Sequence, residues 1–321
     1  MNLRLLILGA AAAPALFTVH PAMSRVAEGE KPLRLIVPYA PGHPIDRLAR
    51  LLAKNLDEQA SQTVVIDNRP AVDGLVGTEM VANSLPDGHT VLIVSSAHAM
   101  YPALGRRLPY HPTKGFTPVT QLADRQLLLV TNPSLPVNSV KELVTLAKKE
   151  PGKLSYASRT PLDALPTELF KMTTGAKIER KTEAQATLTE LVDGQIQLDM
   201  ADAAQALPHV KESRLRLLAI GDSRRSSVVP DVPTMAEAGV KGYQAALWSG
   251  ILAPPKTPKA IVNSMNASMV KVVRSTPFKD ELARVGADAV GSTPAEWSKF
   301  ISAEIVKWHK VAKAAKLQAE Y

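Results

Sequence analysis

Residues 33–46 decide the fold class, and they read Leu33-Arg34-Leu35-Ile36-Val37-Pro38-Tyr39-Ala40-Pro41-Gly42-His43-Pro44-Ile45-Asp46. The segment 33–38 is short and apolar, which predicts a buried strand that ends at a proline turn. From Ile45 to Leu56 the apolar residues recur at helical spacing, and Pro44 suits the first helical position. Strand and helix patterns keep alternating along the chain, which predicts an α/β protein whose parallel sheets are covered by helices on both faces.

The same patterns predict the remaining elements. Ser139 with Glu142 and Thr293 with Glu296 form capping boxes that mark two helix starts. The segment 131–136 is predicted to cross into a second domain, and the chain returns near Trp248, for which a core or hinge role is expected. Strands are expected at 63–66, 89–94, 127–130, 154–157, 196–200 and 215–220, an extended segment at 244–252, and helices at 75–83, 138–149, 165–172, 184–192, 257–274 and 293–314.

Composition and motifs exclude several classes of function. The chain has 321 residues, of which 45% are hydrophobic, so it is long enough to build a sizeable core. The net charge is +8, but the basic residues are scattered and aromatic residues are scarce, so no nucleic-acid partner is expected. The chain has no cysteine, and its seven histidines do not pair at ligand spacing. Because no nucleotide-binding or hydrolase motif stands out either, we expect no enzyme, metal site or cofactor.

Residues 1–27 have the layout of a secretory signal peptide. Arg4 precedes an apolar run over residues 5–19, and Ala22 and Ala27 both suit a cleavage site. The alternative is a membrane anchor, but the run contains Pro14 and is shorter than the roughly 20 residues that a membrane span needs. The mature protein is therefore expected in the periplasm, with its signal peptide removed.

Loops that follow strands form the candidate ligand site, because open α/β sheets bind ligands beyond the carboxyl ends of their strands. In the loop 39–46, a helix N-terminus offers free backbone amides and a positive dipole end to an anion. Asp46 either caps those amides or lines the cleft. Similar junctions occur at 67–77 and at 95–98. Asp199 and Asp202 either pair their carboxylates or place one side chain inward and the other in solvent.

A series of short motifs gives the chain a family resemblance. In this order along the chain, they resemble the substrate-binding proteins of tripartite tricarboxylate transporters, the Bug family. The motifs are Leu35-Ile36-Val37-Pro38-Tyr39-Ala40-Pro41-Gly42 with Asp46, Asp67-Asn68-Arg69-Pro70, Pro86-Asp87-Gly88-His89-Thr90, Leu108-Pro109-Tyr110, Phe116-Thr117-Pro118-Val119, Pro151-Gly152-Lys153-Leu154-Ser155-Tyr156-Ala157-Ser158, Asp231-Val232-Pro233-Thr234, Ala236-Glu237-Ala238-Gly239 and Gly291-Ser292-Thr293-Pro294.

The resemblance implies a class II periplasmic binding protein fold with two lobes that close on a ligand in the cleft between them. Lobe one is expected at 33–131 and 246–321, and lobe two at 132–245. Proteins of this family are not enzymes; they bring a small organic acid to membrane transporter subunits, and some report to a sensor instead. A monomer is expected. The alternatives are a receptor of the same fold that signals to a sensor ectodomain, and a paralogue whose ligand is altered or is not a carboxylate.

Four ligand-side loops depart from the family's pattern. His43 stands where the family has a second glycine, and the segments 71–75, 159–164 and 180–184 replace glycine-rich or apolar loops. These changes introduce His43, Arg159 and Lys181, each of which either binds a ligand carboxylate or faces solvent. The predicted ligand-binding residues are Tyr39, Gly42, His43, Pro44, Ile45, Asp46, Ala71, Val72, Gly74, Ser95, Ser96, Ser158, Arg159, Thr160, Lys181 and Asp202.

Overall fold

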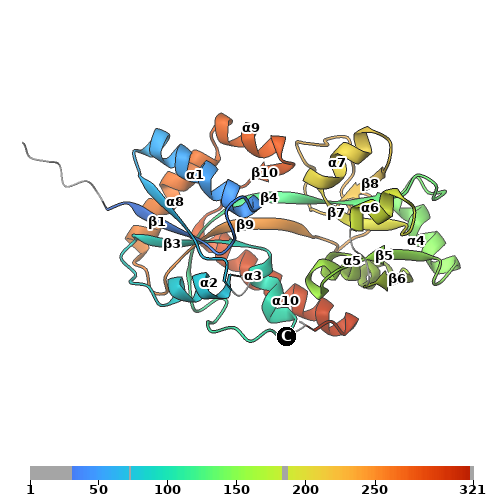
Figure 1. The fold of residues 1–321 in the computed structure, drawn as a ribbon, viewed down its shortest axis with the longest axis horizontal. Coiled ribbons are helices and arrows are strands. Elements are labelled where there is room, and N and C mark those ends of the chain that lie inside the picture. Colours follow the sequence, from blue (N-terminus) through green and yellow to red (C-terminus); the bar gives the residue numbers. More distant parts are fainter. Residues whose placement is uncertain (1–30, 72–73, 183–186, 319–321) are drawn as a thin grey trace, which may run out of the picture. The chain divides into compact units, whose positions relative to one another are not determined.

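The computed structural model describes residues 31–71, 74–182 and 187–318 (Figure 1). The predicted signal peptide at residues 1–27 lies outside these ranges, as does Val72. A search of the described helices found none with the length and apolar character needed to span a membrane.

The N-terminal strands form the parallel part of the main sheet. β1 (Leu33–Val37) lies between β2 (Val64–Asn68) and β3 (Thr90–Ser95) and runs parallel to both. The apolar side chains of β1 are buried on both faces of the sheet, as expected for a parallel strand. Three helices follow these strands in turn, namely α1 (Pro44–Ala60), α2 (Leu75–Ala82) and α3 (Ala97–Ala103).

One long strand, β4 (Thr117–Thr131), joins two groups of strands. Its residues 117–126 pair with β9 (Ala246–Ala253), and its residues 123–125 also pair with β10 (Ala287–Ala289). From Leu127 onward it pairs instead with β7 (Leu198–Asp202) and β8 (Arg216–Ile220). Figure 1 shows β4 and β9 running from the elements around β1 toward the elements around β7. β4 is therefore shared by two groups of strands: one contains β1, β2, β3, β9 and β10, and the other contains β7 and β8.

The remaining elements complete the two groups. β5 (Leu154–Ala157) and β6 (Ile178–Lys181) form a separate parallel pair. α10 (Pro294–Ala315) packs against α3 and α5 (Pro161–Thr174) and closes one side of the core with Trp297 and Trp308. The helices outside the N-terminal part are α4 (Val140–Lys149), α5 (Pro161–Thr174), α6 (Thr187–Val192), α7 (Ala203–Lys211), α8 (Lys259–Val273), α9 (Thr276–Arg284) and α10 (Pro294–Ala315).

The α/β class is confirmed, but the prediction of parallel sheets was wrong for most of the main sheet, where five of the seven described strand pairings are antiparallel. Every pairing of β4 and β9 is antiparallel. Residues 117–126, α3, β6, α7, α9 and β10 had no predicted element. The expected core role of Trp248 is confirmed, because its ring is buried and its Nε1 donates a hydrogen bond to Glu304. β4 changes partners at residues 126–127, ahead of the predicted crossing at 131–136, and the lobe boundaries stay a prediction.

Candidate functional site

The loop between β1 and α1 is held in place by the carboxylate of Asp46. This buried group accepts hydrogen bonds from the Gly42 backbone N–H at 2.8 Å, from Asn68 Nδ2 at 2.9 Å and from Arg50 Nε at 3.0 Å. Burial acts to raise the pKa of Asp46, but the hydrogen bonds from Arg50, Asn68 and Gly42 lower it below its ordinary value. Of the two interpretations of Asp46, this geometry favours the cap, because protein groups surround its carboxylate.

His43 is the cap of α1 and an uncharged neighbour of Tyr39. Its Nδ1 accepts a hydrogen bond from the Ile45 backbone N–H at 3.2 Å, and its ring stacks on that of Tyr39 with centroids 4.2 Å apart. Burial and the positive charges of Arg125 and Arg47 lower the pKa of His43. A histidine that accepts at Nδ1 is neutral. His43 therefore does not supply the second cation that the sequence suggested.

Tyr39 ties the first loop to the end of β3. Its hydroxyl lies 2.5 Å from Ser95 Oγ, and Ser95 Oγ also accepts a hydrogen bond from the Ala97 backbone N–H. Burial raises the pKa of Tyr39 to about 12, so the phenol stays protonated and can donate. Asn68 Nδ2 donates a further hydrogen bond to the Tyr39 carbonyl. The junctions after β1, β2 and β3 thus form one connected structure.

Other predicted residues of these junctions have structural positions. Pro44 occupies the first turn of α1, and Ile45 is buried in the core below it. Gly74 begins α2 with a φ of 82°, and Ala71 is exposed in the turn before it. The Ser96 backbone N–H donates to the Trp248 carbonyl, and its side chain is buried.

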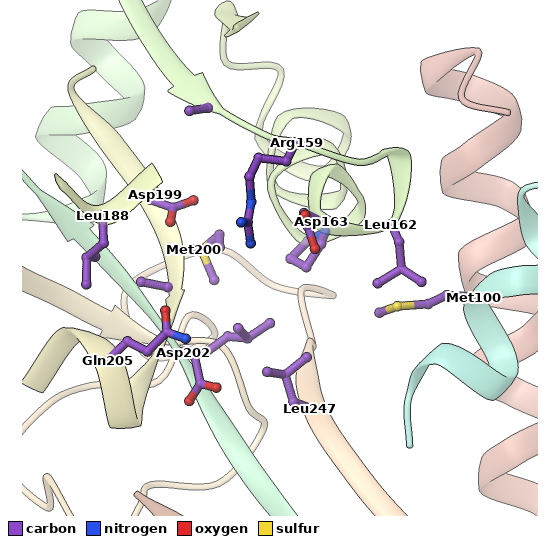
Figure 2. Close-up of a pocket in the computed structure, with 14 residues that line it drawn as sticks. Met100, Arg159, Leu162, Asp163, Leu188, Asp199, Met200, Asp202, Gln205 and Leu247 are labelled. Atoms are coloured by element: carbon purple, nitrogen blue, oxygen red, sulfur yellow. The ribbon is translucent and has the colours of Figure 1, made fainter. Parts of the chain in front are cut away.

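The loop after β5 directs one charged side chain into a cavity. Ser158 is buried, and its Oγ donates to the Thr160 carbonyl at 2.6 Å. Thr160 caps α5 by accepting the Asp163 backbone N–H, and Lys181 Nζ donates to the Gln195 carbonyl at 2.8 Å. Arg159, which lies between Ser158 and Thr160 in the sequence, extends into the cavity (Figure 2). Of the two basic residues that this region introduces, Arg159 is the one that lines the cavity.

This cavity has a volume of about 220 Å³ and is lined from both groups of elements. Its polar wall carries Arg159, Asp163 of α5, and Asp199 and Asp202 of β7. Figure 2 shows Arg159 between Asp199 and Asp163, with Asp202 at the opposite end of the cavity. The apolar wall includes Met100 of α3, Leu127 of β4, Leu162 of α5, Leu188 of α6 and Leu247 of β9. Arg159 and Asp202 are therefore the two predicted ligand-binding residues that meet at this cavity.

Arg125, which the sequence did not single out, pairs with the cavity residue Asp202. Its Nε lies 2.9 Å from Oδ2 of Asp202, although the N–H does not point at that oxygen. The charge of Arg125 helps to lower the pKa of His43 and opposes the rise in the pKa of Tyr39, so the first loop and Asp202 share one nearby cation. The sequence could not indicate this pairing, because Arg125 is an isolated basic residue in a segment for which no strand was predicted.

The two carboxyl groups of β7, Asp199 and Asp202, have different charged neighbours, which act on their pKa values in opposite directions. Burial raises the pKa of Asp199 to about 7, and the negative charge of Asp163 acts in the same direction. Burial also raises the pKa of Asp202, but the positive charge of Arg125 and the Ala204 backbone N–H oppose it. Both side chains line the cavity and are partly exposed, so the two alternatives for this pair stay predictions. Within the ranges that the structure describes, no cluster of three acidic or histidine side chains could hold a metal ion.

Comparison with known proteins gives consistent matches over nearly the whole chain. Residues 48–317 match the model of the tripartite tricarboxylate transporter family receptor. Protein BugT of Bordetella pertussis is 34% identical over 294 residues, which cover 88% of this chain and 89% of BugT.

Two solved structures are similar to this chain at comparable identity. The structure of R. palustris Rpa4515 with adipate matches with 34% identity and a TM-score of 0.70, covering 89% of this chain and 98% of that one. MatC from Rhodopseudomonas palustris with bound malate matches with 28% identity and a TM-score of 0.66, covering 87% of this chain and 98% of that one.

Proposed function

Because this chain belongs to the tripartite tricarboxylate transporter receptor family, we propose that it captures a small organic carboxylate outside the cytoplasm for a transporter of that type. The fold is that of a two-lobed solute receptor. The relatives whose structures hold adipate and malate support a carboxylate ligand. The predicted signal peptide at residues 1–27 supports a periplasmic location, from which the loaded receptor meets membrane subunits.

The observation that carries this proposal is the position of Arg159 in the 220 Å³ cavity. A guanidinium group matches a carboxylate with two parallel hydrogen bonds, which gives both strength and orientation. The apolar wall, with Met100, Leu162 and Leu247, suits the carbon skeleton of a small acid. Arg125 adds a second positive charge beside Asp202 and near His43 of the first loop.

A thermal-shift panel on the mature protein, freed of carried-over ligand, tests the proposal. The panel contains mono-, di- and tricarboxylates, aromatic acids, amino acids and the uncharged amide of each acid. A ligand at about 1,000 times its Kd stabilises a protein by about 4 kcal/mol, which moves the melting temperature by several degrees. We expect a shift with one class of acid and none with its amide. Equal shifts with acids and amides, or no shift with any acid, would contradict a carboxylate receptor.

A further inference from the structure

The cavity has more carboxyl groups than cations in its polar wall. Its polar wall has one guanidinium, from Arg159, and three carboxyl groups. Asp202 is compensated by Arg125, whose Nε lies at 2.9 Å. Asp199 and Asp163 remain, and among the described residues neither forms an ion pair within 4.0 Å. An empty cavity therefore presents one cation and two uncompensated acidic groups to whatever enters it.

This charge pattern discriminates between kinds of organic acid. A plain dicarboxylate can use one carboxylate on Arg159, but its second carboxylate would then lie in a cavity that contains Asp199 and Asp163. The charge of Asp163 and the ionised form of Asp199 would repel that second carboxylate. A ligand that carries an ammonium group as well as a carboxylate would instead place its carboxylate beside Arg159 and its ammonium group beside an acidic side chain. Each charge of the ligand would then meet a group of opposite charge on the wall.

Asp199 is the acidic group best placed to accept such an ammonium. It is half-buried on β7, whereas Asp163 is exposed at the start of α5. Figure 2 shows the Asp199 carboxyl and the Arg159 guanidinium facing the same space from different elements. We infer that the ligand is an amino acid, whose carboxylate binds Arg159 and whose ammonium group binds Asp199. This inference rests on the proposed carboxylate-receptor function and narrows its ligand class.

The ionisation of Asp199 agrees with this assignment. Burial disfavours its charged form and raises its pKa to about 7 in the empty cavity. An ammonium group beside it would favour the carboxylate and release the proton. The competing explanation is a structural ion pair between Arg159 and Asp199, but the two side chains show no contact within 4.0 Å in the described residues.

The test uses isothermal titration calorimetry of the mature protein with matched pairs of acids. Each pair is an amino acid and the acid that lacks only its amino group: L-aspartate and succinate, L-glutamate and glutarate, L-phenylalanine and 3-phenylpropionate. We expect at least one amino acid to bind about tenfold or more tightly than its partner. Asp199→Asn should remove that difference, whereas Asp193→Asn, at an exposed site outside the cavity, should keep it.

The outcomes separate the inference from the proposed function. If the deaminated acids bind as tightly as the amino acids in every pair, and Asp199→Asn changes neither, the ligand class is wrong while the carboxylate receptor stands. If no acid of any pair binds the native protein, the amino-acid inference fails, and the thermal-shift panel, which contains further classes of acid, decides whether the proposed function fails with it. Circular dichroism of the Asp199→Asn variant confirms that any loss of binding does not come from misfolding.

Discussion

The Nε atom of Arg125 lies 2.9 Å from Oδ2 of Asp202, and this pair joins the first part of β4 to the cap of α7. The two side chains are only 22% and 16% exposed, so solvent screens the interaction less than it screens a surface ion pair. Asp202 also lines the cavity. We therefore expect Asp202 and a ligand carboxylate to compete for the guanidinium of Arg125.

Opposite changes at this pair should have opposite effects on carboxylate binding. Asp202→Asn releases the charge of Arg125 while keeping a good cap for α7, so we expect tighter binding. Arg125→Gln removes the cation, and we expect affinity to fall about tenfold or more. Calorimetry with the best acid of the thermal-shift panel measures both. If neither variant changes the affinity, the pair only supports the fold.

The two basic residues of the altered loops should differ in importance. Arg159 lines the cavity, whereas Lys181 donates to the Gln195 carbonyl at 2.8 Å. We expect Arg159→Gln to weaken carboxylate binding about tenfold or more, because a charged donor to a carboxylate is lost. Lys181→Gln serves as the matched control and should leave the affinity within about twofold. An equal loss in both variants would place Lys181 in the ligand site as well.

Substitution of Gly74 should strongly destabilise the protein. Its φ is 82°, and an added Cβ would lie 2.4 Å from the Pro38 carbonyl oxygen. Gly239 has a φ of 95° but no atom within 4 Å of its would-be Cβ, so Gly239→Ala measures the conformational cost alone. We expect a loss of about 1 kcal/mol for Gly239→Ala and of several kcal/mol for Gly74→Ala. Urea unfolding compares the two, and similar losses would contradict the steric argument.

A buried carboxyl group should make stability depend on pH. Burial, together with the charge of Asp222, raises the pKa of Asp124 to about 7, above the value of 3.8 expected in the unfolded chain. As pH rises from about 4 to about 7, the unfolded chain ionises this group first, so the native state loses stability. We expect the melting temperature of Asp124→Asn, relative to the native protein, to increase over that range and then level off. A difference that is constant with pH would show that Asp124 ionises normally.

The N-terminal part of the fold could be predicted because local patterns decide it. β1 and β3 are apolar runs, and α1 has buried positions at helical spacing. Residues 117–126 could not be predicted in the same way, because they form a strand with buried polar side chains. Gln121, Asp124 and Gln126 find partners that are distant in the sequence, such as Ser292, Arg224 and Asp288. Such a strand has no local signature.

For the candidate site, the sequence could predict the position of the loops but not the roles of their residues. The loops 39–46 and 158–160 could be located from their positions after strands. The roles of Asp46 and Lys181 could not be predicted, because their partners Asn68 and Gln195 are distant in the sequence and only the folded chain brings them near. Arg125 is important because it pairs with Asp202, and Asp199 because it is desolvated in the cavity beside Asp163. A single sequence shows neither burial nor these neighbours.

The sharing of β4 has a consequence for how the protein unfolds. Neither group of strands has its own complete central strand, because residues 117–126 serve one group and residues 127–131 serve the other. Melting of either group would strip hydrogen bonds and apolar cover from a strand that the other group needs. Domains linked only by flexible connectors can melt separately, whereas this arrangement makes the two groups one cooperative unit. Calorimetry of the unliganded protein should accordingly show a single transition, whose van't Hoff and calorimetric enthalpies agree.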